Sequence, residues 1–238
     1  MRSGWKTPEP LMLQSLLRDM ASAGTTHVAM EVSSHALEQA RVVPLKFRVG
    51  AFTNLAHDHL DYHGDQARYV AAKRRLFLEH LDETGVAVVN VDDVHAADVV
   101  RGTPARILRV SLRDRAADVV VVGSSFGVEG QRAEIQTPRG LLRVRSHLMG
   151  EFNLANIALA VGVGVTLELS LDQIRHGIER LRGIPGRLER VDNARDVTVL
   201  VDYAHTENAL RSALAALRPI TRRRLIVVFG CGGDRDRL

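Results

Sequence analysis

The densest group of chemistry-bearing residues in this 238-residue chain lies between positions 57 and 63. Three histidines and two aspartates fall within these seven positions: His57, Asp58, His59, Asp61 and His63. Imidazole and carboxylate groups bind metal ions, but this spacing matches no structural zinc pattern. Carboxylate-rich surroundings fit Mg²⁺ better. A single histidine here would more often be structural, whereas five such residues together favour a metal or phosphate site.

The apolar run at 27–32 predicts a short buried strand. The segment from Met30 to His35 overlaps the end of this strand and continues beyond it with polar residues. Polar residues at the carboxyl end of such a strand lie where open α/β sheets bind ligands. Glu31 directly after buried residues is costly unless it meets a cation or a metal. An ordinary strand-to-loop transition explains the same residues, so the segment alone leaves both interpretations open.

Three later segments place polar residues at element ends. Residues 150–156 open a helix with Asn153 and Asn156 one turn apart. Arg187 stands at a predicted domain junction near Pro185, where a guanidinium can close on phosphate. Asp202 and His205 follow an apolar strand pattern at 198–201. The glycine-rich turn at 229–236 is weak support for a site, since glycines often only permit a bend. Lys73 lies in a helical pattern, where lysine is usually a solvated surface charge.

The elements that must position these residues alternate along the chain. Hydrophobic periodicity predicts helices at 11–20, 65–81, 151–166, 171–181 and 208–217, and strands at 27–32, 49–53, 85–90, 198–201 and 225–229. The β-branched run 85–90 is typical of a parallel sheet with both faces covered. Short strands with turn signals at 105–147 indicate a small antiparallel flap. The last strand–helix–strand succession predicts a βαβ-like unit.

Composition excludes several function classes. Hydrophobic residues make up 45% and charged residues 25%, as in globular proteins, and no run approaches the roughly 20 apolar residues of a membrane span. A single cysteine, Cys231, and no visible secretory signal predict a cytoplasmic protein. The net charge of +4 and pI near 9.7 favour anionic partners. Because the arginines are scattered without interleaved aromatics, we expect no nucleic-acid partner.

Taken in order, these segments resemble the Mur ligase family, and within it the members that form the tripeptide precursor. The matching segments are Thr7-Pro8, 30–35, 58–64, 71–77, 150–156, 186–189, 202–206 and 229–236. The resemblance implies an α/β fold: a partial central ATP-binding domain at 1–184, with a mostly parallel sheet, helices and the flap, then the start of a Rossmann-like C-terminal domain at 185–238. No Gly-x-x-x-x-Gly-Lys-Ser/Thr loop is present and the last unit stops after two strands, so we expect an internal piece of such a ligase.

The resemblance also implies roles for single residues. Lys73 is expected to be the family's carbamylated lysine, whose amine captures CO₂ and becomes a carboxylate that helps to hold Mg²⁺, with Glu31 and His59 as the other metal ligands. The positions expected to hold the UDP-sugar dipeptide are Thr7, Ser33, Gln39 and Arg41. Those expected to contact ATP are Asn153, Arg187 and Asp202, and His205 is expected near the transferred phosphate.

In this family a substrate carboxylate attacks the γ-phosphate of ATP, and an amino acid then displaces phosphate from the acyl phosphate. The resemblance implies addition of the third amino acid, diaminopimelate or lysine, to UDP-N-acetylmuramoyl-L-alanyl-D-glutamate in peptidoglycan synthesis. The chain departs from the family's Thr-Thr-Pro at Lys6-Thr7-Pro8 and from its His-Thr-Pro-Asp at 205–208. We expect the chain alone to be inactive.

Two alternatives remain beside this interpretation. The first is a non-catalytic, shortened homologue that binds the nucleotide-sugar precursor or ATP. The retention of Glu31, His59 and Lys73 favours the enzyme over it, because a non-catalytic homologue should lose metal ligands first. The second is a superfamily ligase that adds D-alanyl-D-alanine or forms folate polyglutamate, and the segment 30–35 argues against it.

Overall fold

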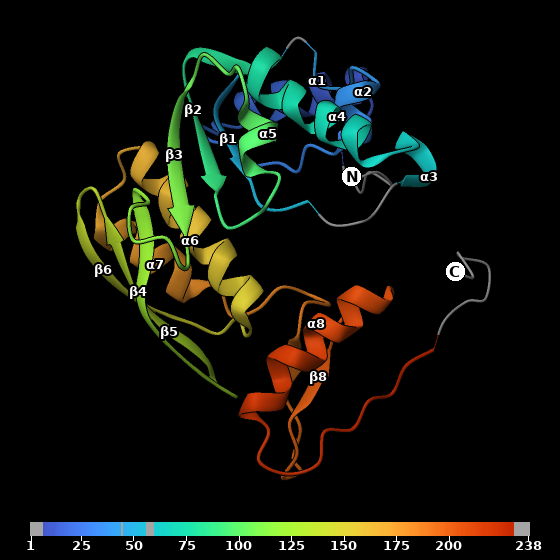
Figure 1. Ribbon diagram of the computed structural model, residues 1–238, viewed down its shortest axis with the longest axis vertical. Helices are drawn as coiled ribbons and strands as arrows, with labels where there is room; N and C mark the ends of the chain where they lie inside the picture. Colours follow the sequence, from blue (N-terminus) through green and yellow to red (C-terminus); the bar gives the residue numbers. More distant parts are fainter. Residues whose placement is uncertain (1–6, 44, 56–59, 231–238) are drawn as a thin grey trace. The chain divides into compact units, whose positions relative to one another are not determined.

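The computed structural model describes residues 7–43, 45–55 and 60–230 (Figure 1). The chain divides into two compact units, Met1–Ser111 and Leu112–Leu238. None of the described helices is long and apolar enough to cross a membrane.

The first unit contains three parallel strands, β1 (Phe47–Phe52), β2 (Leu81–Asn90) and β3 (Arg106–Ser111), with β2 between the other two. Val88 pairs in register with Ala51 on one side and Leu108 on the other. Residues 86–89 of β2 are buried, as expected for a parallel strand covered on both faces. The predicted strands at 49–53 and 85–90 are confirmed.

Helix α4 (Gln66–Glu79) covers this sheet together with α5 (Ala96–Val100), which lies beside it (Figure 1). The Asp65 carboxylate accepts the backbone N–H of Arg68 at 2.8 Å and so caps the first turn of α4. The buried face of α4 carries Tyr69, Ala72 and Phe77, of which Tyr69 and Phe77 pack in one apolar cluster with Phe52, Val89 and Val99. The helix predicted at 65–81 is confirmed.

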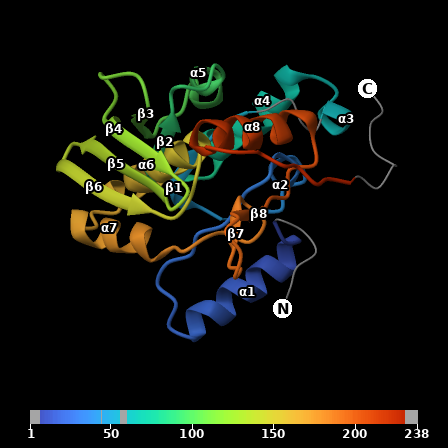
Figure 2. The ribbon, with the colours of Figure 1, turned by 90° about the horizontal axis from the view of Figure 1, so that it is seen from below.

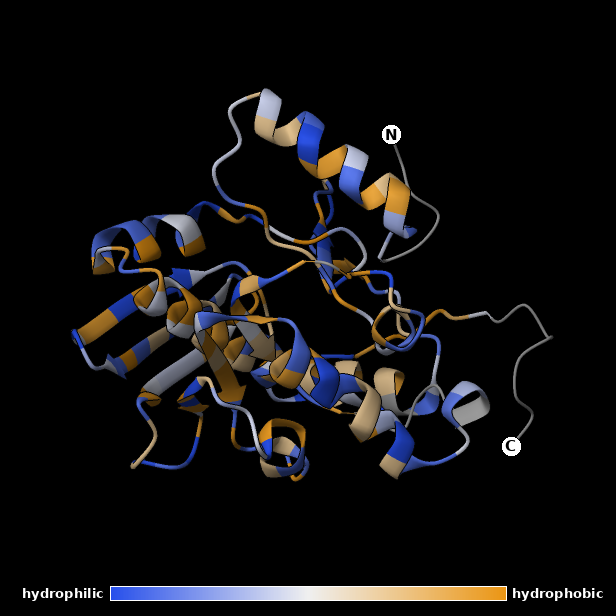
Figure 3. Ribbon diagram, turned by 90° about the horizontal axis from the view of Figure 1, so that it is seen from above, coloured by the Kyte–Doolittle hydropathy of each residue, from blue (hydrophilic) through white to orange (hydrophobic). Residues whose placement is uncertain are grey.

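Helices α1 (Pro10–Ser22), α2 (Ser34–Glu38) and α3 (Leu60–His63) complete the first unit. The prediction of a helix at 11–20 is confirmed. Leu13 of α1 packs against Leu37 and Val42 in a second small apolar cluster. Other apolar side chains of α1, among them Leu11, remain exposed, and apolar and polar residues alternate along this helix in Figure 3.

The strand predicted at 27–32 is wrong. These residues adopt no regular secondary structure, and the side chain of Val28 is 49% exposed. A strand forms only when a neighbouring strand accepts and donates its backbone hydrogen bonds. No strand in the described part of the chain pairs with this segment, so its apolar composition alone does not make it one.

The second unit begins with an antiparallel sheet of β4 (Val119–Gly127), β5 (Gly130–Thr137) and β6 (Gly140–Ser146). Gly130 has φ +114°, and a Cβ placed there would lie 2.0 Å from the carbonyl oxygen of Ser146, so only glycine fits. The predicted flap is confirmed for these strands. It begins later than position 105, however, because β3 pairs in parallel with β2 and belongs to the first unit's sheet.

Helix α6 (Glu151–Thr166) packs on β4 and β5, and α7 (Leu171–Arg180) runs beside β6 (Figure 2). The apolar side chains of α6 lie on most sides of the helix, which is typical of a buried helix. The hydroxyl of Ser170 accepts the N–H of Gln173, whose side chain returns a bond to Ser170, and this capping box begins α7. Both predicted helices are confirmed.

The segment after Pro185 contains β7 (Glu189–Val191), β8 (Val199–Val201), α8 (Glu207–Leu217) and a 3₁₀ turn (Arg218–Ile220). The prediction of a strand near 198–201 and a helix near 208–217 is confirmed. The expected βαβ-like unit is wrong for the described residues, because β8 pairs antiparallel with β7 and 225–229 forms no strand. Val228 is 95% exposed, which is consistent with a segment that has no sheet neighbour.

Candidate functional site

The residues expected to bind the dipeptide meet in the first unit. The hydroxyl of Thr7, which is 1% exposed, donates to the Glu31 carbonyl at 2.9 Å and accepts the Ser33 N–H at 3.2 Å. The guanidinium of Arg41 donates to the Thr7 carbonyl at 3.1 Å and to the Gln39 side-chain oxygen. The structure therefore places Thr7, Ser33, Gln39 and Arg41 in one hydrogen-bonded group, named here the Thr7 cluster.

Helix α2 positions this cluster through both of its ends. At its start the Ser33 hydroxyl accepts the N–H of Ala36 at 3.2 Å. At its end Ala40 has φ +55°, and the chain turns back so that the Arg41 N–H reaches the Ala36 carbonyl at 2.8 Å. A non-glycine residue in the left-handed region costs about 1 kcal/mol. The turn that brings Gln39 and Arg41 beside Thr7 thus carries a local strain.

The Thr7 cluster presents hydroxyl, amide and guanidinium groups, which bind polar and anionic ligands. Arg41 is 7% exposed and its guanidinium lies 3.3 Å from the carboxylate of Glu9. The Gln39 amide also donates to the hydroxyl of Tyr62 at 3.1 Å. A guanidinium held by several partners keeps its orientation fixed, which suits recognition of a carboxylate or phosphate.

A buried histidine lies between α2 and α4. The Nε2 atom of His63 is 2.9 Å from the Ser34 hydroxyl, and Nδ1 is 3.1 Å from the Glu38 carboxylate. The His63 ring stacks on Tyr69, with ring centroids 5.1 Å apart. The order Ser–His–Glu is that of a nucleophilic triad, but Ser34 is 2% exposed and offers no access to a substrate carbonyl. The arrangement therefore fixes the position of α2.

The expected metal ligands are only partly within the described residues. His59 lies outside them, together with its neighbours His57 and Asp58. The side chain of Glu31 is exposed, and Lys73 is half-buried with its Nζ 5.2 Å from the centroid of the Tyr69 ring. The described residues contain no group of three His, Cys, Asp or Glu side chains that could hold a metal. A protonated lysine offers no lone pair to a metal ion.

The residues expected to contact ATP lie in the second unit. The Asn153 amide is buried and donates to the Met149 carbonyl at 2.8 Å. Both carboxylate oxygens of Asp202 accept backbone N–H groups, from Leu188 and Ala204, each at 2.8 Å. Met149 and Leu188 pack in the same small apolar cluster, which links the segments that carry Asn153 and Asp202.

Arg187 and His205 are both exposed. The Nδ1 atom of His205 lies 3.0 Å from the Tyr203 carbonyl, and its ring contacts the Tyr203 ring at a centroid distance of 5.1 Å. The Tyr203 N–H donates to the Gly186 carbonyl at 2.8 Å, which joins the segment before β7 to the segment after β8. Arg187 lies in the first of these segments and His205 in the second, so the two residues are on neighbouring stretches of chain.

Sequence reasoning did not assign the contact among Ser34, Glu38 and His63. One signal was available, because Ser34 and Glu38 are four residues apart and therefore share a helix face. The histidine that bridges them comes from a segment 29 residues away from Ser34, and no local pattern indicates that contact.

Comparison with known proteins gives a consistent result across the chain. The Mur ligase middle domain matches residues 2–164, and the domain described as "Mur ligase, glutamate ligase domain" matches residues 186–238. A Geobacter sulfurreducens protein named UDP-N-acetylmuramoyl-L-alanyl-D-glutamate--2,6-diaminopimelate ligase is 49% identical over 97% of this chain and 46% of its own length. A Nostoc protein of the same name is 43% identical over 97% of this chain and 47% of its own.

Solved structures agree. A ligase of that same name superposes with a TM-score of 0.80 at 35% identity, over 96% of this chain and 47% of that one. A D-alanyl-D-alanyl ligase from Acinetobacter baumannii superposes with a TM-score of 0.63 at 25% identity, over 72% of this chain and 37% of that one. The chain spans about half the length of the curated relatives it matches. With a middle-domain match over most of its residues and relatives along its whole length, this chain belongs to the Mur ligase family.

Proposed function

We propose that the protein containing this chain is an ATP-dependent ligase that adds diaminopimelate to UDP-N-acetylmuramoyl-L-alanyl-D-glutamate. The names of relatives at 42–49% identity support this reaction, and they favour diaminopimelate over lysine. The Thr7 cluster carries the proposal, because it holds a buried arginine, an amide and two hydroxyls in one fixed group. Its substrates are small molecules.

The reaction has two steps. An oxygen of the substrate's terminal carboxylate forms a bond to the γ-phosphorus of ATP, the bond to the bridging oxygen breaks, and ADP leaves. The amine of diaminopimelate then attacks the acyl carbon, the carbon–oxygen bond to phosphate breaks, and the amine loses a proton. Such transfers depend mainly on positioning and charge neutralisation. Side chains of the Thr7 cluster would hold the dipeptide, Asn153, Arg187 and Asp202 would contact ATP, and His205 would lie near the transferred phosphate.

Glu31, His59 and a carbamylated Lys73 would hold Mg²⁺, which would neutralise charge on the phosphates. A carboxylate, a carbamate and an imidazole fit this ion, since oxygen donors predominate. Carbamylation joins the neutral Lys73 amine to CO₂ and releases one proton. The place of Lys73 in the segment 71–77, within the match to the Mur ligase middle domain, supports this role.

Binding of UDP-N-acetylmuramoyl-L-alanyl-D-glutamate to the 238-residue chain tests the Thr7 cluster directly. We expect isothermal titration to show at least a tenfold loss of affinity in Arg41→Met, because a charge-assisted bond contributes about 1.5–3 kcal/mol. Arg18→Met removes the same charge from an exposed position on α1 and should leave affinity unchanged. Equal affinity in both variants would remove the Thr7 cluster from the substrate site.

Phosphate release tests the reaction in the protein expressed from the complete reading frame. Release should require ATP, the dipeptide precursor and diaminopimelate, with lysine a poor substitute, whereas the 238-residue chain alone should show none. Lys73→Ala should abolish most turnover, and formate or acetate should restore part of it. Lys46→Ala, at an exposed position of the first unit, is the control. Precursor binding without turnover in the complete protein would instead favour a non-catalytic homologue.

A further inference from the structure

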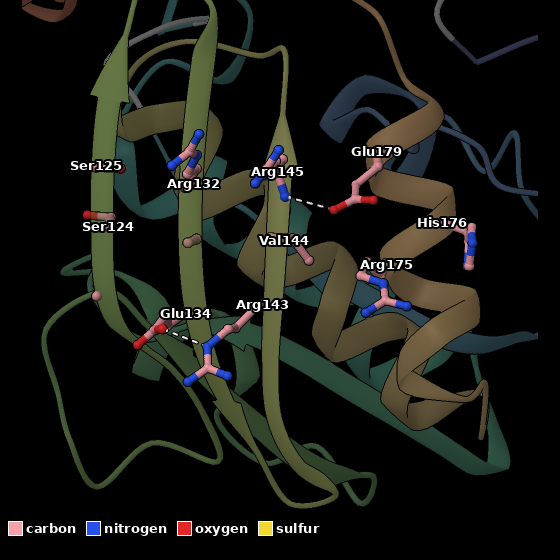
Figure 4. A pocket seen from close by; sticks show the side chains of 12 residues that line it. Ser124, Ser125, Arg132, Glu134, Arg143, Val144, Arg145, Arg175, His176 and Glu179 are labelled. Atoms are coloured by element: carbon pink, nitrogen blue, oxygen red, sulfur yellow. Dashed lines mark hydrogen bonds and ion pairs between the residues drawn. The ribbon is translucent and has the colours of Figure 1, made fainter.

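Two adjoining hollows lie on the β4–β6 sheet beside α7 and are named here the arginine groove. Figure 4 shows residues that line the larger hollow. Their volumes are about 700 and 520 Å³, within the range of small-molecule sites. Both hollows share Ser125, Arg132, Arg145 and Glu179. The larger one is lined by four arginines and only two glutamates, so positive charge predominates.

Two of these arginines form a cross-strand pair of like charge. Arg132 of β5 and Arg145 of β6 are direct register partners, and Ser125 of β4 pairs with Arg132 on its other side. The two arginines lie on adjacent strands in Figure 4, and both side chains are exposed. Like charges directly opposite each other destabilise a sheet. An anion bound between the two guanidiniums would remove that cost.

The nearby carboxylates are engaged elsewhere. Glu134 accepts from Arg143 at 2.8 Å, Glu129 accepts from Arg190 at 2.7 Å, and Glu179 accepts the backbone N–H of Arg145 at 3.1 Å. The bond to Glu129 raises the pKa of Arg190. Among the described residues no carboxylate lies within ion-pair distance of the Arg132 or Arg145 guanidinium. The charge of this pair is therefore available to a ligand.

We propose that the arginine groove binds a phosphate monoester, such as a sugar phosphate. Arg132, Arg145 and the Ser125 hydroxyl would bind the phosphate dianion, whose charge matches the two guanidiniums. The groove shares no residue with the positions proposed to hold the dipeptide, ATP or Mg²⁺, so it is a separate site.

Titration of the 238-residue chain, followed by ¹H–¹⁵N NMR, tests the site with three probes: glucose 6-phosphate, inorganic phosphate and glucose. We expect saturable binding of both phosphates and none for glucose. The double variant Arg132→Gln/Arg145→Gln should weaken both phosphates at least tenfold while the fold stays intact, because both side chains are exposed. Arg211→Gln removes an exposed arginine from α8 and is the matched control.

Three results would overturn the proposal as a whole. The first is an absence of saturable phosphate binding at millimolar concentrations. The second is an equal loss of affinity in Arg211→Gln and in the double variant, which would mean that general charge alone attracts phosphate. The third is tighter binding of a single-stranded oligonucleotide than of the monoester, which would make the groove a nucleic-acid surface.

Discussion

The Nε2 atom of His63 lies 2.9 Å from the hydroxyl of Ser34, although 29 residues separate them in sequence. Both side chains are buried, and the other ring nitrogen of His63 reaches Glu38. A carboxylate only accepts hydrogen bonds, so Nδ1 carries the proton and, in the neutral ring, Nε2 accepts from Ser34. One imidazole thereby fixes both ends of α2, the helix flanked by Ser33 and Gln39 of the Thr7 cluster.

Replacing His63 should therefore affect stability and ligand binding together. We expect His63→Ala to lower the free energy of unfolding by about 2–4 kcal/mol, since the hydrogen bonds to Ser34 and Glu38 and the ring contact with Tyr69 are lost. Affinity for the dipeptide precursor should fall because α2 loses its anchor. Urea unfolding and isothermal titration measure the two effects. His27→Ala, at an exposed position in the same unit, should change neither.

Thr7 uses one hydroxyl for two hydrogen bonds, so an isosteric change isolates that atom. Thr7→Val keeps the volume but leaves the Glu31 carbonyl and the Ser33 N–H without this partner. We expect a loss of about 1–3 kcal/mol in unfolding free energy and weaker precursor binding. Thr7→Ser retains the hydroxyl and should keep most of both. Identical behaviour of the two variants would contradict the role given to the hydroxyl.

Asp202 holds a turn together in the second unit as well as being a proposed ATP contact. Asp202→Asn keeps one acceptor oxygen and places an amide N–H₂ against a backbone N–H, either that of Leu188 or that of Ala204. Chemical denaturation should show a loss of about 1–3 kcal/mol. Asp196→Asn, at an exposed position in the preceding loop, should stay within about 0.5 kcal/mol of the unsubstituted chain.

Two neighbouring residues on α4 test which face of the helix is buried. Phe77 is almost fully buried against β1 and β2, whereas Leu78 is exposed. Phe77→Ala should cost about 3–5 kcal/mol, the usual result of opening a cavity of that size. Leu78→Ala should cost less than about 1 kcal/mol. Comparable losses in thermal and urea unfolding would mean that α4 packs differently.

The ion pair of Arg75 and Glu79 on α4 should make a small contribution that depends on pH. The hydrogen bond from Arg75 holds the pKa of Glu79 below its ordinary value of 4.5. The stabilisation is therefore present above pH 4.5 and is lost as pH falls through the lowered folded-state pKa. For so exposed a pair it amounts to about 0.3–0.5 kcal/mol. Glu79→Gln should lower the free energy of unfolding by this amount at neutral pH but not at a pH below the folded-state pKa of Glu79. In an Arg75→Gln background, the effect of Glu79→Gln on the free energy of unfolding should no longer depend on pH.

Local patterns in the sequence were sufficient for most helices. The helix predicted at 151–166 has the bounds of α6, and the helix predicted at 65–81 corresponds to α4. Helices close their hydrogen bonds within one segment, and the capping residues that end them are neighbours in sequence. The same holds for the turns of the β4–β6 flap, where glycines mark the hairpins.

Pairing between distant segments was decided only by the tertiary structure. The apolar runs at 27–32 and 225–229 predict strands. Neither run has a pairing strand among the described residues, and neither is a strand. The charge pair of Arg132 and Arg145 depends on the register of β5 against β6. A strand's hydrogen bonds, and the side chains placed opposite one another, belong to two segments at once.

The candidate site was likewise predictable from the sequence only in part. The sequence by itself determined the family resemblance and the residue types of the Thr7 cluster, because those depend on the order of short motifs. Only the folded chain decided that Arg41 reaches the carbonyl of Thr7, 34 residues earlier, and that His63 reaches Ser34. Such contacts form where the packing of α1, α2 and α4 brings separate segments together, and packing is a property of the whole unit rather than of any one stretch of sequence.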